Sequence, residues 1–264
     1  GQLHQMLDQE GAAGTVCDWS QTARTPEQAY ALIDRAFAEF EMGRKRPKHI
    51  TVPISVLEGM APSAPPVAAT YTSECGASDF GVAALVAKAK RPMFIFGGGC
   101  VDAAKAARAV VDRIGAASFT TYAGRGVLPP ESPLNFGSYL ARQGSEEIIA
   151  TSDLVIAVGT ELAEVDLWRD ALGHKGTLVR IDIDPEVLVD RHRADVVGLG
   201  RAESFFAGLL AALPETSSRD WQPAEVRMAR ARWRAELDAE RPTILPVVEA
   251  LRQVVPEDAY IYSD

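Results

Sequence analysis

The sequence predicts an α/β protein whose main body is a doubly wound, mostly parallel six-stranded sheet, flanked by partial α/β segments. Short runs that are apolar at every position, such as Pro92–Phe96 and Leu154–Val158, alternate with helical stretches across residues 79–213. Strands of this kind are buried on both faces. The helices between them provide the crossovers that parallel strands require, so the alternation indicates an α/β sheet.

Residues 1–57 contain one clear helix and one clear strand. Thr25 can cap the helix, Pro26 suits its first position, and Gln28 completes a capping box. Apolar residues then recur with a period close to 3.6, which is typical of an amphipathic helix. A short strand over residues 49–52 follows. This segment is therefore predicted to be part of a small α/β unit.

The central segment shows the most regular pattern. Its strands and helices are separated by glycine-rich turns, in which the backbone can bend sharply. The predicted strands cover residues 92–96, 118–122, 154–158, 177–181 and 195–197. The predicted helices cover residues 80–89, 102–114, 145–150, 165–172 (a helix or a turn) and 204–213.

Two further segments separate or follow this body. Residues 58–78 hold three prolines and no clear period, which predicts a fairly stiff linker. Residues 214–240 are a polar linker and a charged helix that we expect to be a solvated connector. Residues 241–264 begin with an amphipathic helix at 244–255, and a strand is expected from Ala259. Because a domain rarely ends on an unpaired apolar strand, we expect the chain to be part of a longer protein.

Composition and charge exclude several classes of protein. The net charge is −9, so the surface repels nucleic-acid phosphates and anionic lipids, and neither is expected as a partner. The apolar runs are too short to cross a bilayer. Three scattered cysteines, Cys17, Cys75 and Cys100, favour the reducing cytoplasm over a disulfide framework. The histidine spacing and the lack of a GxSxG motif predict neither a metal ligand nor a catalytic residue in this chain.

Small and acidic residues follow the predicted strands. In a doubly wound sheet the ligand cleft lies at the carboxyl ends of the strands, near the point where the strand order reverses. Glycines there let backbone N–H groups approach an anion, and carboxylates can bind ribose hydroxyls. The candidate cofactor-binding residues are Gly97, Gly98, Gly99, Thr120, Thr121, Gly159, Thr160, Asp182 and Asp184.

Some of these residues also have a simpler interpretation. Gly97, Gly98 and Gly99 can form a tight strand-to-helix turn with no ligand. The dinucleotide fingerprint requires a third glycine where this chain has Asp102, which disfavours a Rossmann dehydrogenase. Asp184 can cap the helix that begins at Pro185. The residues alone leave these alternatives open.

Three ordered stretches together resemble the thiamine-diphosphate-dependent enzymes of the acetolactate synthase and 2-oxo-acid decarboxylase superfamily. The first is residues 25–57, with Gly-Arg-Lys-Arg-Pro before His-Ile-Thr-Val-Pro. The second runs from Arg91 to Pro185, with Gly-Gly-Gly, Thr-Thr, Gly-Arg-Gly, Val-Gly-Thr and Ile-Asp-Ile-Asp-Pro in the family's order. The third is residues 244–264.

The resemblance implies a domain for each segment. Residues 1–57 are similar to the end of the family's pyrimidine-binding domain. Residues 79–213 are similar to its central domain, which has a DHS-like nucleotide-binding fold. Residues 241–264 are similar to the start of its diphosphate-binding domain. The family's activating glutamate and its GDG…N motif have no counterpart here, so the chain by itself is expected to be inactive.

The resemblance also implies cofactors and partners. Members use thiamine diphosphate and Mg²⁺ to decarboxylate 2-oxo acids or to join carbon units, and they form homodimers or homotetramers. Their central domains bind FAD, bind another nucleotide, or serve as a scaffold without a ligand. The phrase from Glu161 to Asp166 resembles decarboxylase members, including the 5-guanidino-2-oxopentanoate decarboxylase group. Arg201 stands where the family's Gly-Asp-Ala phrase has an acid.

Two other classes of function stay open from the sequence. The first is an FAD- or nucleotide-binding module of the flavoprotein type. The second is a purely structural domain that packs subunits and carries no ligand. Bound flavin would give a yellow protein, which distinguishes the first class from the second.

Overall fold

The computed structural model describes residues 6–65, 77–213, 219–256, 259 and 261 of the chain. The chain divides into two compact units, Gly1–Cys75 and Gly76–Asp264. Parts of both predicted linkers, at residues 66–76 and 214–218, lie outside the described residues. So does most of the strand expected from Ala259. The predicted domain bounds therefore stay a prediction.

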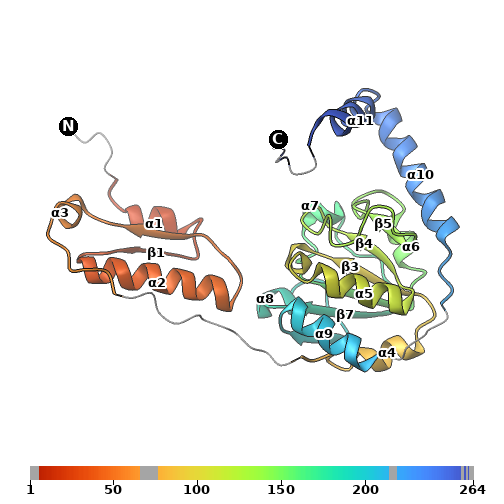
Figure 1. The fold of residues 1–264 in the computed structure, drawn as a ribbon, viewed down its shortest axis with the longest axis horizontal. Coiled ribbons are helices and arrows are strands. Elements are labelled where there is room, and N and C mark those ends of the chain that lie inside the picture. Colours follow the sequence, from red (N-terminus) through yellow and green to blue (C-terminus); the bar gives the residue numbers. More distant parts are fainter. Residues whose placement is uncertain (1–5, 66–76, 214–218, 257–258, 260, 262–264) are drawn as a thin grey trace. The chain divides into compact units, whose positions relative to one another are not determined.

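Among its described residues, 6–65, the first unit is a two-stranded parallel sheet with three helices (Figure 1). Strand β1 pairs in register with β2, and Ser20 lies opposite His49. No strand was predicted before residue 49, so β1 is an addition to the prediction. The elements are α1 (Gln9–Gly14), β1 (Trp19–Thr22), α2 (Pro26–Met42), β2 (Lys48–Thr51) and α3 (Ile54–Leu57).

The start of α2 follows the sequence prediction closely. The Thr25 hydroxyl accepts a hydrogen bond from the Gln28 N–H at 3.3 Å, and Pro26 occupies the first turn. The Gln28 side chain accepts from the N–H of Arg24 at 2.7 Å instead of from Thr25. The second hydrogen bond of the predicted capping box therefore goes to the residue before the N-cap. It still satisfies a backbone N–H just before the helix.

A charged cluster joins α2 to both strands of the first unit. The Glu39 carboxylate accepts hydrogen bonds from the Trp19 indole N–H at 2.8 Å and from the Lys48 ammonium at 2.7 Å. Lys48 also pairs with Asp18, and the Arg35 guanidinium lies 4.7 Å from the centre of the Trp19 ring. The Lys48 hydrogen bond, aided by those from Trp19 and Arg35, lowers the pKa of Glu39 to about 2 against the opposing effect of burial.

The second unit is built on six strands that are all parallel, in the order β5-β4-β3-β6-β7-β8. This confirms the α/β prediction of a parallel six-stranded sheet. The three-residue strand β5 follows several prolines and was not among the predicted strands. The strands are β3 (Pro92–Phe96), β4 (Ala117–Thr120), β5 (Asn135–Gly137), β6 (Leu154–Val158), β7 (Thr177–Asp182) and β8 (Val196–Leu199).

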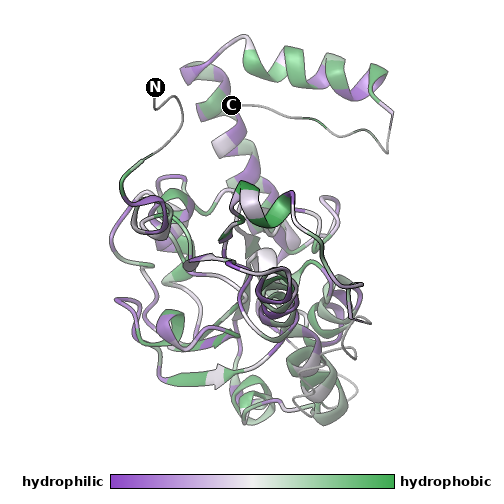
Figure 2. Ribbon diagram, turned by 90° about the vertical axis from the view of Figure 1, so that its left-hand side faces the viewer, coloured by the Kyte–Doolittle hydropathy of each residue, from purple (hydrophilic) through white to green (hydrophobic). Residues whose placement is uncertain are grey.

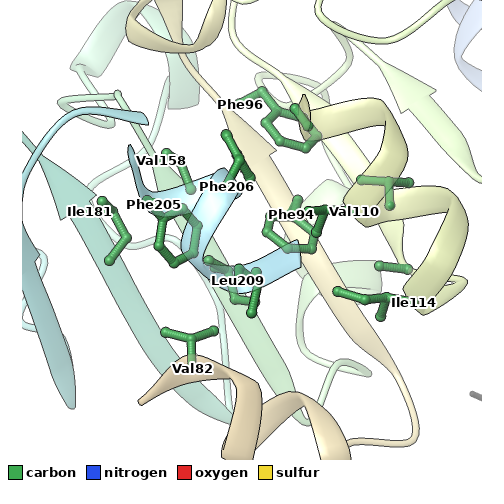
Figure 3. Packing of buried hydrophobic residues seen from close by; sticks show 14 of the residues in the cluster. Val82, Phe94, Phe96, Val110, Ile114, Val158, Ile181, Phe205, Phe206 and Leu209 are labelled. Carbon is green, nitrogen blue, oxygen red and sulfur yellow. The ribbon is translucent and has the colours of Figure 1, made fainter. Parts of the chain in front are cut away.

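Helices cover both faces of this sheet. The helices of the second unit are α4 (Val82–Lys88), α5 (Ala104–Ile114), α6 (Ser145–Ile149), α7 (Glu164–Leu167), α8 (Pro185–Leu188), α9 (Ala202–Ala212), α10 (Pro223–Glu240) and α11 (Ile244–Val254), with a 3₁₀ turn η1 (Gly98–Cys100). One face packs on α4, α5 and α9, where Phe94, Phe96, Phe205 and Phe206 form a buried aromatic group (Figure 3). This group is the centre of the larger of two apolar clusters.

The opposite face of the sheet is covered in part by α10, which corrects one prediction. Val226, Ala229 and Trp233 of this helix are buried with Phe119 and Phe136 of the sheet. The Trp233 indole N–H donates to the Gln143 carbonyl at 3.0 Å. The prediction that this helix is a solvated connector is therefore wrong for the face that carries these residues. Apolar spacing of three and four residues was hidden among the charges.

Helix α11 differs from α10 in its exposure. None of its residues is buried, and hydrophobic residues recur along it (Figure 2). Val247, Val248 and Leu251 each expose between 43% and 56% of their surface. The predicted amphipathic helix is confirmed within one residue. In the part of the chain that the structure describes, no helix is both long and apolar enough to span a membrane.

Candidate functional site at the carboxyl edge of the sheet

The strand order places two predicted glycine segments next to each other. From β3 the chain proceeds outward through β4 and β5, and it then returns to β6 on the other side of β3. The strand order therefore reverses between β3 and β6, where doubly wound sheets bind ligands. Gly97 follows β3 and Gly159 follows β6, so both lie at this position.

The glycines at this edge pack against each other. The Gly97 N–H donates to the Val158 carbonyl at 2.9 Å, and the Gly99 N–H donates to the Gly159 carbonyl at 3.1 Å. A Cβ atom on Gly97 would lie 2.0 Å from the Gly159 oxygen, and one on Gly99 would lie 2.9 Å from the Gly159 Cα. Gly159 also has a φ of +58°, which disfavours other residues. Contact between two loops thus requires these glycines.

The three predicted threonines are buried. Thr120 ends β4, and the Thr121 N–H donates to the Phe96 carbonyl at 2.9 Å. The Thr121 hydroxyl accepts from the Gly124 N–H at 3.2 Å, and the Thr160 hydroxyl accepts from the Leu162 N–H at 3.0 Å. Two of these hydroxyls therefore stabilise the turns that follow their own strands.

The two predicted aspartates also bind the backbone. Asp182 and Asp184 expose 5% and 6% of their surface. The Asp182 carboxylate accepts from the Asp184 N–H at 3.0 Å, and the Asp184 carboxylate accepts from the Glu186 N–H at 3.0 Å. Asp184 is the N-cap of α8, which confirms the helix-cap interpretation of this residue. Asp182 orders the turn before it.

An ion pair that was not predicted from the sequence supports the same edge. Arg180, in the middle of β7, is buried and lies 2.5 Å from the Asp190 carboxylate. Its guanidinium also donates to the carbonyls of His192 at 3.1 Å and of Thr160 at 3.3 Å. Arg180 therefore holds the loop after β6 against the loop after α8. An arginine within an apolar strand was the signal that could have revealed it.

Burial also sets the protonation of groups around this network. Desolvation lowers the pKa of His192, although the Asp190 charge and the Leu162 backbone oppose the shift. Burial acts against the ionised form of Asp190 as well. The Arg180 guanidinium and the His192 N–H outweigh it, so the pKa of Asp190 is lowered. These two shifts favour the ionised carboxylate of Asp190 and the neutral imidazole of His192.

Two further groups near the edge have shifted pKa values. Burial raises the pKa of the Cys100 thiol, which donates to the Val158 carbonyl at 3.1 Å, so this cysteine is an inert core residue. Burial raises the pKa of Asp166, although the Tyr122 N–H, 3.3 Å away, opposes the shift. Among the described residues, no group of three or more His, Cys, Asp and Glu side chains could hold a metal ion.

The nine predicted residues thus fall into three groups. The structure brings Gly97, Gly98, Gly99, Gly159 and Thr160 together at the switch between β3 and β6. Thr120 and Thr121 follow the neighbouring strand β4, and Asp182 and Asp184 follow β7 on the other side. Gly98 and Gly99 are exposed, whereas the five side chains that carry hydroxyl or carboxyl groups, at 120, 121, 160, 182 and 184, are buried. The assignment of a nucleotide to this edge stays a prediction.

The fold and the edge define an α/β domain of the doubly wound class, with strand order and switch point typical of nucleotide-binding domains. The family described as "Thiamine pyrophosphate enzyme, central domain" matches residues 81–209. Residues 81–209 therefore belong to the central domain of the thiamine pyrophosphate enzyme family.

Curated relatives of the chain agree with this family. A probable 2-ketoarginine decarboxylase of Pseudomonas aeruginosa is 37% identical over 278 aligned positions, which cover 100% of this chain and 48% of the relative. A pyruvate oxidase of Lactiplantibacillus plantarum is 28% identical over 66% of this chain and 30% of the relative. The chain thus spans about half the length of the first of these relatives.

Solved structures show the same fold. Benzoylformate decarboxylase from Polynucleobacter necessarius superposes with a TM-score of 0.71 at 19% sequence identity, over 83% of this chain and 42% of that chain. A thiamin diphosphate-dependent enzyme from Mycobacterium smegmatis, itself described as putative, gives a TM-score of 0.66 at 21% identity, over 81% of this chain and 42% of that chain.

Proposed function

We propose that this chain is the central part of a thiamine-diphosphate-dependent enzyme that acts on 2-oxo acids by decarboxylation, with 2-ketoarginine as the first substrate to test. One observation carries the proposal, namely the 37% identity to a probable 2-ketoarginine decarboxylase along the whole chain. The likeness extends through both units, whereas the central-domain match covers residues 81–209. The Glu161 to Asp166 phrase favours the same group of decarboxylases.

The proposal assigns a part of the enzyme to each segment. Residues 1–57 form the end of the pyrimidine-binding domain, and residues 241–264 form the start of the diphosphate-binding domain. The parallel pair of β1 and β2 and the exposed apolar face of α11 support this assignment, because each fits a part of a larger α/β domain. Residues 58–78 and 214–240 are the connecting segments, of which α10 packs on the central sheet.

Thiamine diphosphate, bound with Mg²⁺, supplies the chemistry as an electron sink for the negative charge that forms when CO₂ leaves a 2-oxo acid. We assign none of this chain's residues to either group. The described residues contribute a rigid central body instead, in which Arg180 and the packed glycines hold the loops at the carboxyl edge of the sheet.

To test the proposal, the complete coding region that contains this sequence is expressed, and CO₂ release by the purified product is measured. The panel is 2-ketoarginine, pyruvate and benzoylformate, each with thiamine diphosphate and Mg²⁺. We expect 2-ketoarginine to give the highest kcat/KM. Equal or better turnover of pyruvate would contradict the substrate assignment, and no turnover of any 2-oxo acid would contradict the proposed activity.

A matched measurement uses the 264-residue chain alone. We expect no CO₂ release from it with any of the three acids, because the proposal places the thiamine diphosphate ligands elsewhere in the enzyme. Turnover by this chain would show that it carries a complete active site.

The proposal also includes an assembly and a location. We propose a homodimer or homotetramer in the cytoplasm, supported by the family's usual assembly and by the three scattered cysteines. Sedimentation of the product of the complete coding region tests the assembly, and a monomer at micromolar concentration would contradict it.

A further inference from the structure

We infer that the carboxyl edge of the central sheet is a closed contact between loops and does not take the diphosphate of FAD or of another adenine dinucleotide. The fold makes such a ligand a natural expectation, because the strand order is that of dinucleotide-binding domains. The inference concerns this domain alone and goes beyond the proposed decarboxylation. Three features of the edge disagree with a dinucleotide.

The first feature is the use of the backbone N–H groups. A phosphate site after a strand needs several N–H groups that point at the ligand. Four of the five successive N–H groups from Gly97 to Val101 already donate within the protein. Those of Gly97 and Gly99 bind the end of β6 and its loop, and those of Cys100 and Val101 bind carbonyls of their own 3₁₀ turn. The turn from Gly97 to Val101 therefore has few backbone N–H groups left to donate to a phosphate.

The second feature is what fills the space beside the glycines. In a dinucleotide site the absent Cβ of the second glycine lets the pyrophosphate approach the backbone. Here that space is taken by protein, because a Cβ on Gly99 would lie 2.9 Å from Gly159 Cα. The reverse also holds, since a Cβ on Gly159 would lie 2.8 Å from Gly99 Cα. Loop packing thus accounts for the glycines without a ligand.

The third feature is the charge at the start of α5. This helix begins at Ala104, and no side chain caps it. Asp102 precedes it and is exposed, whereas Lys105 in its first turn is exposed and offsets that charge. The side-chain charges of Asp102 and Lys105 offset each other, so they add no net positive charge for a diphosphate at this helix end.

The test measures binding of FAD and ADP by equilibrium dialysis, with the 264-residue chain and with the product of the complete coding region. We expect both proteins to be colourless after purification and to bind neither nucleotide up to about 1 mM, a limit that excludes all but very weak sites. Bound flavin at one molecule per chain, or saturable binding of ADP, would overturn the inference. Neither outcome bears on CO₂ release, so the proposed function is tested separately.

Two variants give an independent readout through thermal unfolding of the 264-residue chain. Gly97→Ala places a Cβ 2.0 Å from the Gly159 oxygen, whereas Gly98→Ala places one 3.1 Å from the Cβ of Ala123 on an exposed loop. We expect Gly97→Ala to lower the Tm by more than about 5 °C and Gly98→Ala to change it far less. Inorganic pyrophosphate, compared with sodium chloride at equal ionic strength, should not raise the Tm of the unaltered chain. A rise that Gly98→Ala abolishes would overturn the inference, because it would show that the loop is an anion cradle.

Discussion

Arg180 of β7 and Asp190, which follows α8, form an ion pair of 2.5 Å in which the arginine side chain exposes only 1% of its surface. The guanidinium bridges the carbonyls of Thr160 and His192, so this single side chain connects the loops that follow β6 and α8. A buried charge is stable only while its partners are present. The pair is therefore a requirement for the geometry of the whole edge.

Removal of the acid from this pair should destabilise the second unit strongly. Asp190→Ala leaves the buried guanidinium of Arg180 without its carboxylate, which costs about 3 kcal/mol of unfolding free energy. Urea unfolding of the 264-residue chain measures the change. The control is Asp170→Ala, because Asp170 is fully exposed and its pair with Arg191 spans 3.6 Å. Equal stability of the two variants would contradict the role of Arg180.

The charged cluster of the first unit predicts a pH dependence. The pKa of Glu39 is about 2 in the folded chain against an ordinary value of 4.5. A lowered carboxyl pKa stabilises the folded state above the ordinary value, and this contribution is lost as the pH falls from about 4.5 to 2. Glu39→Gln should therefore cost about 1 kcal/mol at pH 7 and almost nothing near pH 2, since the cluster is partly exposed.

The difference is measured by following the NMR signal of the Trp19 indole N–H, which donates to Glu39, as the first unit unfolds across this pH range. Glu58→Gln is the matched control, because it removes an exposed carboxylate elsewhere in the same unit. If Glu39→Gln lowered the free energy of unfolding by the same amount at every pH, this prediction would be contradicted. Hydrogen bonding alone, and not the ionised carboxylate, would then account for the stabilising effect of the cluster.

The packing of α10 predicts a contrast between its two faces. Trp233 is completely buried and Met228 exposes 72% of its surface. Trp233→Ala should lower the unfolding free energy by about 3–5 kcal/mol through the lost transfer energy and the cavity. Met228→Ala should change it by less than about 0.5 kcal/mol. Chemical denaturation measures both changes. If both variants lost a similarly small amount of unfolding free energy, α10 would be the solvated connector that the charge pattern predicted.

The strands of the central sheet could be predicted where the sequence pattern was unambiguous. Pro92–Phe96 and Leu154–Val158 are apolar at every position, and the structure places strands at the same residues. Strand β1 could not be found in this way, because Trp19–Thr22 has three polar residues and no buried face. Strand β5 has three residues and follows several prolines, so its pairing with β4 depends on tertiary contacts.

The candidate site shows the same division. The cap at Asp184 depends on residues that are close in the sequence, and the Asp-Pro pair indicated it. The contact between Gly99 and Gly159 joins loops that are 60 residues apart, so only the folded sheet brings them together. The sequence could therefore predict which residues reach the carboxyl edge. It could not predict that most of the backbone N–H groups after β3 donate within the protein, or that the space beside Gly99 is filled by Gly159.

The most direct test of the central claim removes the proposed cofactors from the product of the complete coding region. Dialysis against a chelator takes away Mg²⁺ and, with it, thiamine diphosphate, whose diphosphate the metal is proposed to hold. We predict that CO₂ release from 2-ketoarginine is lost and that it returns only when both thiamine diphosphate and Mg²⁺ are added. Full activity in the dialysed protein, or recovery without thiamine diphosphate, would contradict the account.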